Sequence, residues 1–179
     1  MIPVEYFWFA LIFAFCIVGM IRGLAKELGA STILLITLFA LGEGWELVVS
    51  RFAPAALGKG AVSPSSMLEV AYYGIAILLV AFISYEGVVL NFPMRGTQGL
   101  PKAFLGLLGG LLNGYLVVGT VWNVVARAGY LQARFPGIMS DLTDFHNMIV
   151  HYLPVSVIGI SPFIFLVPGL FLLLLIVLK

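Results

Sequence analysis

The sequence predicts an all-α integral membrane protein, a single membrane domain over residues 1–179, with four to five transmembrane helices and one amphipathic interfacial helix. Of these residues 62% are hydrophobic and 9% are charged, whereas soluble chains average roughly 45–50% apolar and 25% charged residues. Long apolar runs alternate with short polar segments, as in membrane helix bundles. The net charge of +1 provides no basic face, so we expect no binding of nucleic acid.

The first apolar run, about residues 3–21, is long enough to cross a hydrocarbon core roughly 30 Å thick. No basic residue precedes it, so we expect a retained helix and not a cleaved signal peptide. A compact polar hinge with Arg22, Lys26 and Glu27 follows, and the second helix, about residues 28–49, begins directly after it. So short a connection predicts an antiparallel hairpin.

Carboxylates mark the ends of the next two helices. Glu43 and Glu46 share a face near the end of the second helix, and Glu69 opens the third, about residues 68–91. A carboxylate in hydrocarbon is costly unless it is paired or solvated, so it is a candidate functional site. We expect Glu43 and Glu46 to lie at the interface, solvated or paired with Arg51. The alternative is that the three glutamates form a path for cations or protons.

Near the other end of the third helix stands Glu86. If successive helices are antiparallel, Glu86 lies on the same side of the membrane as Arg22 and Lys26. We therefore expect a structural ion pair at the polar hinge.

The fourth helix, about residues 103–126, carries glycines four residues apart at Gly106, Gly110 and Gly114, with Gly109 beside them. Glycine in a helix interior costs about 0.5–1 kcal/mol relative to alanine, so the repetition needs a structural reason. In lipid that reason is the close approach of a neighbouring helix. We expect this glycine stripe to pack against helices of partner subunits.

Two segments carry a family resemblance. The first helix ends in Gly-Met-Ile-Arg-Gly-Leu (residues 19–24), with Glu27 five residues after the arginine, and Leu-Gly-Leu-Leu-Gly-Gly-Leu-Leu-Asn-Gly (residues 105–114) repeats glycine in a later helix. The pair resembles the colicin V production protein (CvpA) family of small bacterial membrane proteins, although the C-terminal region departs from that pattern. The resemblance implies an export-, envelope- or stress-related membrane protein.

An amphipathic helix is predicted over about residues 140–153, from apolar residues at three- and four-residue steps. Its polar face includes Asp141, Asp144, His146 and His151. The histidines are five residues apart and cannot share one face, so we expect no metal site. The last segment, about residues 163–178, is interrupted by Pro168 and predicts a short or kinked fifth span; a re-entrant or interfacial piece is the alternative.

The sequence contains no P-loop, no nucleophile–base motif and only one cysteine, Cys16, so we expect neither enzyme activity nor a cofactor. The leading hypothesis is a non-catalytic subunit or scaffold in the bacterial inner membrane, in contact with lipids and other integral membrane subunits. A respiratory or photosynthetic electron-transfer complex is one such assembly. The alternatives are a stand-alone CvpA-like envelope or export protein and a small oligomeric proton or cation channel. Basic residues in the short connections favour an N-terminus outside.

Overall fold

The computed structural model describes residues 5–52, 64–86, 90, 92, 99–129 and 144–178. Within these ranges the regular structure is entirely helical, which confirms the predicted all-α fold. Three helical segments are long and apolar enough to cross a membrane, namely Leu24–Arg51, Met67–Glu86 and Leu100–Arg127. The fold is therefore that of a multi-pass membrane protein.

The first two helices, α1 (Glu5–Arg22) and α2 (Leu24–Phe52), are joined by Gly23 alone. Gly23 has a φ of 82°, a left-handed conformation that glycine adopts without steric cost. The expected polar hinge is therefore not a loop: Arg22 ends α1, and Glu27 lies in the first turn of α2. A carboxylate in that turn suits the positive end of the helix dipole, so α2 begins earlier than residue 28.

The third span is divided into α3 (Pro64–Glu69), a π-helical stretch η2 (Val70–Ile75) and α4 (Ala76–Glu86). Periodicity alone predicts one uniform helix here. Residues 87–89 and 91, the end of that predicted helix, lie outside the described part of the chain. The π-helical stretch places Tyr72 and Tyr73 against Trp45 of α2, with both ring centroids 5.6 Å from the indole.

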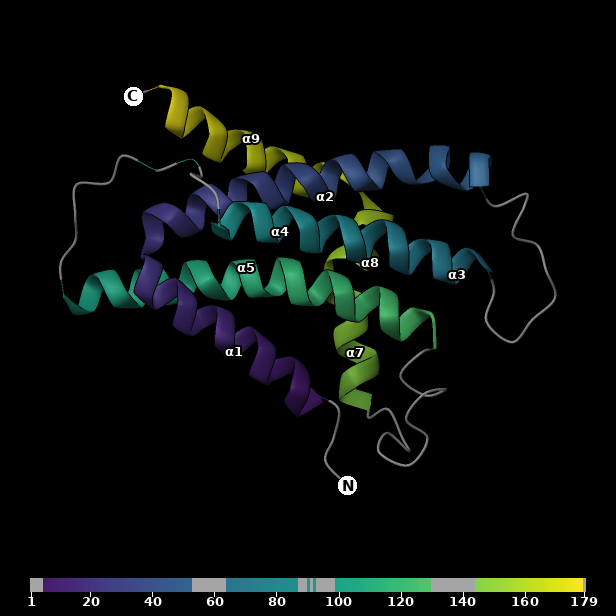
Figure 1. Cartoon of the computed structure of the whole chain (residues 1–179), viewed down its shortest axis with the longest axis horizontal. Coiled ribbons are helices and arrows are strands. Elements are labelled where there is room, and N and C mark those ends of the chain that lie inside the picture. Colours follow the sequence, from purple (N-terminus) through teal and green to yellow (C-terminus); the bar gives the residue numbers. More distant parts are fainter. Residues whose placement is uncertain are drawn as a thin grey trace.

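Helix α5 (Leu100–Arg127) is the centre of the bundle. It packs against α1 on one side and against α2, α4 and η2 on the other (Figure 1). Leu34, Leu38, Ile77 and Leu116, which fill the space between α2, α4 and α5, are almost completely buried. The core thus lies where the three long spans meet.

The C-terminal region forms α7 (Asp144–Tyr152), α8 (Pro154–Ile160) and α9 (Phe163–Val177). Helices α7 and α8 cross behind the long spans, and α9 turns back along α2 (Figure 1). The bend between α8 and α9 is 105°, so the last span is broken or re-entrant. The sequence does not predict α8 as a separate helix, although Pro154 at its start favours one.

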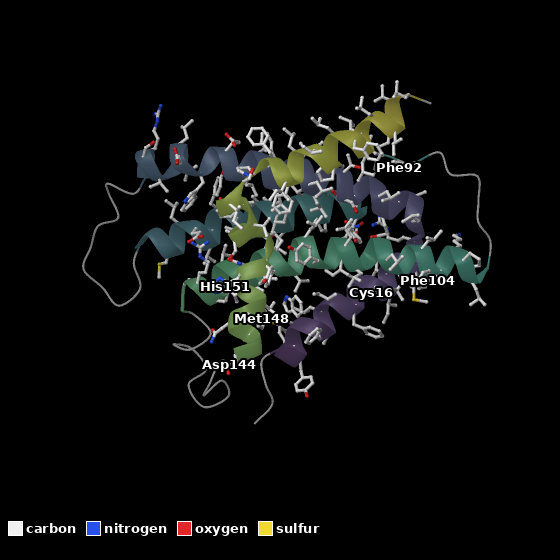
Figure 2. All side chains as sticks on the ribbon, turned by 180° about the vertical axis from the view of Figure 1, so that it is seen from behind. Cys16, Phe92, Phe104, Asp144, Met148 and His151 are labelled. Carbon is white, nitrogen blue, oxygen red and sulfur yellow. The ribbon has the colours of Figure 1, made fainter. Side chains whose placement is uncertain are left out.

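Helix α7 presents less polar surface than its sequence predicts. Asp144 and His151 are exposed, and Figure 2 shows them at either end of the helix with Met148 between them. His146, expected on the polar face, is only 2% exposed and lies 6.1 Å from the ring of Trp122. The face that carries His146 is thus turned toward α5; Asp141 lies outside the described residues.

Candidate functional site

The glycine stripe of α5 is occupied by α1 of the same chain. A Cβ atom on Gly110 would overlap the carbonyl oxygen of Phe15, and one on Gly19 would overlap that of Gly106. At Gly114 a Cβ would lie 2.9 Å from the Cβ of Phe15. The stripe therefore allows the close approach that its spacing predicts, but the neighbour is α1 and not a helix of a partner subunit.

Gly109 packs against a different helix, α2. A Cβ at this position would lie 2.6 Å from the Cβ of Glu27. The absence of a side chain lets Glu27 approach α5 next to Asn113. Gly109 is thus the position that admits a carboxylate to the inside of the bundle.

Glu27 is completely buried and lies at the centre of a polar cluster formed by Arg22, Glu27, Ser31, Tyr85 and Asn113, here called the Glu27 cluster. Its Oε1 lies 3.1 Å from Nη1 of Arg22. Its Oε2 accepts hydrogen bonds from the Tyr85 hydroxyl at 2.8 Å and from the Asn113 amide at 2.7 Å. Both carboxylate oxygens are therefore paired, which is what makes a buried charge tolerable.

Arg22 also contacts α4. Its Nη2 donates to the carbonyl oxygen of Ser84 at 3.2 Å, and its guanidinium carbon lies 4.1 Å from the centroid of the Tyr85 ring. This is a cation–π geometry. The ion-pair partner of Arg22 is thus Glu27. Glu86, the partner that the sequence predicts, is exposed at the end of α4, as is Lys26 on α2.

Asn113 and Ser31 complete the cluster from α5 and α2. The Asn113 amide donates to the backbone carbonyl of Glu27 at 3.0 Å as well as to its carboxylate. The Ser31 hydroxyl lies 2.7 Å from Oδ1 of Asn113 and 2.9 Å from the Glu27 carbonyl. One charged centre therefore joins α1, α2, α4 and α5, and its groups hold each other in place.

A second polar site lies near the opposite end of the long spans, in a cavity of about 480 Å³ that we call the Glu69 pocket. Glu43, Glu46, Glu69 and Arg127 line it, together with Gly159 and Pro162 at the α8–α9 bend. Glu69 is paired with Arg127, 3.1 Å away, whereas Glu43 and Glu46 are exposed. The three glutamates that the sequence groups as a candidate ion path therefore line one cavity. The positive charge paired with Glu69 in this cavity is that of the Arg127 side chain.

The two polar sites are separated by the apolar core. Leu34 and Leu38 lie between Glu27 and Glu43 on α2, and Leu116 lies between Asn113 and Arg127 on α5. All three are at most 1% exposed. Buried polar residues also lie along these helices, namely Thr32 on α2 and Thr120 and Asn123 on α5, and the hydroxyls of both threonines donate to backbone carbonyls of their own helices.

Nothing in the sequence predicts that the Tyr85 hydroxyl donates a hydrogen bond to Glu27. Ser31 and Asn113 carry weak signals: Ser31 is one helical turn after Glu27, and Asn113 lies within the glycine stripe.

Among the described residues no group of three or more His, Cys, Asp or Glu side chains is arranged to hold a metal ion. Comparisons with protein-family models, with curated proteins and with solved structures find no match.

Proposed function

We propose that this chain is a non-catalytic subunit that docks onto other integral membrane proteins in a bacterial inner membrane. The observation that carries the proposal is the broken α8–α9 element. Gly159 and Ile160 are exposed at its bend. The amides of Ser161, Ile164 and Phe165 donate to carbonyls within the chain, but the last carbonyls of a helix such as α8 have no partner within that helix. In lipid, irregular backbone is tolerated only where protein or water covers it. The Glu69 pocket lies on one side of the bend, and in this proposal a neighbouring subunit covers the exposed side.

The outer face of α9 supports the same function. Phe163, Val167, Leu170 and Leu174 are all exposed and are separated by four, three and four residues. This spacing places them along one stripe that a second helix can pack against. Because α1 already fills the glycine stripe of α5, α9 takes over the docking role that the sequence assigns to the glycines. A respiratory or photosynthetic electron-transfer complex is an assembly of this kind.

The distribution of charge favours an N-terminus outside. Among the described residues, Arg22, Lys26 and Lys102 lie at the end of the bundle where α1 meets α2, whereas Arg51 and Arg127 lie toward the other end. Basic residues close to the membrane favour the cytoplasmic side. The end with Arg22 would then face the cytoplasm.

The CvpA resemblance supports the alternative of a stand-alone envelope or export protein. The residues that carry it are Arg22, Glu27 and the glycines of α5, and these are the residues that hold α1, α2 and α5 together. The resemblance thus concerns how the bundle is built. It is compatible with either a subunit or a stand-alone protein.

Site-specific photocrosslinking tests the docking function. A photoreactive amino acid at Leu170, on the exposed stripe of α9, is expected to yield an adduct with one defined membrane protein. The matched position is Ile83, which is also apolar and exposed but lies on α4; it is expected to react with lipid. If Leu170 also reacts with lipid alone, and the chain runs as a monomer in mild detergent, the docking function is wrong.

A proton or cation channel is the second candidate, because Glu43, Glu46 and Glu69 line one polar cavity. This function requires the apolar core to open. It predicts ion flux in reconstituted liposomes that falls with Glu43→Gln or Glu46→Gln. The absence of flux with the wild-type protein would exclude it.

A further inference from the structure

A long apolar groove lies between α1 and α4, with α5 as its floor. Its volume is about 700 Å³. Ala14, Val18 and Phe82 belong to its walls, and Val117 and Val121 to its floor. The lining combines small and β-branched residues with aromatic rings.

The groove extends along α1. Its lining runs from Phe7 to Val18 on this helix, roughly 16 Å at 1.5 Å per residue. Unbranched alkyl chains carry no side groups and can lie along such a groove.

The two ends of the groove differ in polarity. At one end the groove is lined by Phe7 and Trp122, whose apolar rings have centroids 6.5 Å apart. At the other end Tyr85 lines the groove, and the Arg22 guanidinium lies over its ring. Arg22 follows Val18 by one helical turn, so the groove leads toward a basic side chain.

Two lysines extend this basic end. Lys102 lies beside the hinge, with its Cε 3.2 Å from the Cβ position of Gly23, and Lys26 is exposed in the first turn of α2. The charge of Arg22 is balanced by Glu27, and Glu86 is the exposed carboxylate at the end of α4. No ion pair involves Lys26 or Lys102 within the described ranges, which leaves both charges available to an anion.

We propose that this groove binds an anionic membrane phospholipid. One acyl chain lies in the groove, and the phosphate lies at Lys26, Lys102 and the outer edge of Arg22. The chain end then lies toward Trp122, and the glycerol lies near Tyr85. Burial of methylene groups supplies affinity without regard to headgroup. The two lysines supply the preference for an anion, at a strength typical of basic residues near lipid phosphates.

Native mass spectrometry of the full chain in detergent tests this. Dioleoylphosphatidylglycerol and dioleoylphosphatidylcholine carry the same acyl chains, so their difference reports the headgroup alone. We expect one tightly retained phosphatidylglycerol, bound about 30-fold better than phosphatidylcholine, since two lysines contribute about fivefold each. Lys26→Gln with Lys102→Gln should abolish this preference while leaving the weaker binding of phosphatidylcholine intact.

Filling the groove separates this site from the general lipid shell. Ala14 is exposed in the groove wall, and Ala14→Phe should remove the retained lipid of either kind. Ala40→Phe, at an exposed position of α2 outside the groove, should not. Equal retention in both variants would overturn the site. Equal affinity of the wild type for the two lipids would overturn it as well. So would a photoreactive amino acid at position 14 that crosslinks to a polypeptide in place of lipid. None of these outcomes depends on whether α9 docks a partner.

Discussion

The amide nitrogen of Asn113 lies 2.7 Å from Oε2 of Glu27, so the central helix supplies one of the three side chains that neutralise or solvate this carboxylate. The other two, Arg22 and Tyr85, come from α1 and α4. Glu27 itself is 0% exposed. The hydrogen bonds of one buried charge therefore depend on four helices being in register.

Removal of the buried carboxylate should be the most damaging single change at this site. Glu27→Ala leaves the Arg22 guanidinium partly buried without its anion, at an expected cost of about 3–5 kcal/mol. Thermal unfolding in detergent measures the loss. Glu86→Ala, at the exposed end of α4, should stay within about 0.5 kcal/mol of wild type. Similar losses in the two variants would contradict the assignment of Glu27 as the partner of Arg22.

Two tyrosine hydroxyls allow a matched comparison. Tyr85 donates to the charged Glu27, and Tyr115 donates to the neutral carbonyl of Tyr152 at 2.6 Å. Tyr85→Phe should cost about 1.5–3 kcal/mol, whereas Tyr115→Phe should cost about 0.5–1.5 kcal/mol. Unfolding in detergent ranks the two variants. The reverse order would show that the Tyr85 hydrogen bond is not the stronger one.

The contact of α1 with the glycine stripe should fail when a side chain is added to it. Gly110→Leu places atoms on the carbonyl group of Phe15 and the Cα of Cys16, and it should cost more than the roughly 1–3 kcal/mol of ordinary overpacking because backbone cannot yield. The readout is Cys16, which is 6% exposed: a maleimide should label it much faster in the variant.

Leu111→Ile is the control for this substitution. Leu111 is the next residue of α5 and is 43% exposed. Its replacement should change neither labelling nor stability. Slow labelling of Cys16 in both variants would mean that α1 does not lie on the glycines.

The ion pair in the Glu69 pocket should matter far less than the buried one. Arg127 is 48% exposed and Glu69 17%, so water and salt weaken their attraction. Glu69→Gln should cost about 0.2–1 kcal/mol, and less at high salt. A double-mutant cycle with Arg127→Gln isolates the pair. A coupling as large as that between Arg22 and Glu27 would indicate a dry pocket.

The single-residue connection between α1 and α2 predicts a sharp requirement for glycine. Gly23→Ala forces an L-residue to a φ of 82°, at a cost of about 1–2 kcal/mol. Gly159→Ala in α8, where an added Cβ meets nothing within 4 Å, should instead stabilise by about 0.4–1 kcal/mol. Opposite signs in the unfolding midpoint are expected. A neutral Gly23→Ala would argue against the left-handed hinge.

Apolar length and periodicity are enough to predict the three long spans, Leu24–Arg51, Met67–Glu86 and Leu100–Arg127. The start of α9 at residue 163 and the centre of α5 follow from hydrophobic runs that are difficult to mistake. The hinge could not be predicted in the same way, because charged residues such as Arg22 and Lys26 are typical of loops. In this chain they occupy helical turns, since the turn that contains Glu27 can bury its carboxylate against α5.

The partners of the candidate site depend on helix rotation, which a single sequence does not specify. Tyr85 and Glu86 are adjacent, yet they point about 100° apart on a helix. The one turned inward binds Glu27 and the other is exposed. The π-helical stretch η2, which precedes α4, changes this rotation further and leaves no clear mark in hydropathy. Charge alone favours Glu86 as the partner of Arg22, but the structure pairs Arg22 with Glu27, and the Tyr85 hydroxyl donates to the same carboxylate.

The short distance in sequence between Arg22 and Glu27 bears on the order in which this chain enters a bilayer. The two residues are five apart and belong to the first hairpin, so they can neutralise each other as soon as α2 has been synthesised. Tyr85 and Asn113 emerge from the ribosome much later. The first hairpin can therefore be inserted with its charges already compensated, and the later helices then replace the water that remains around the carboxylate.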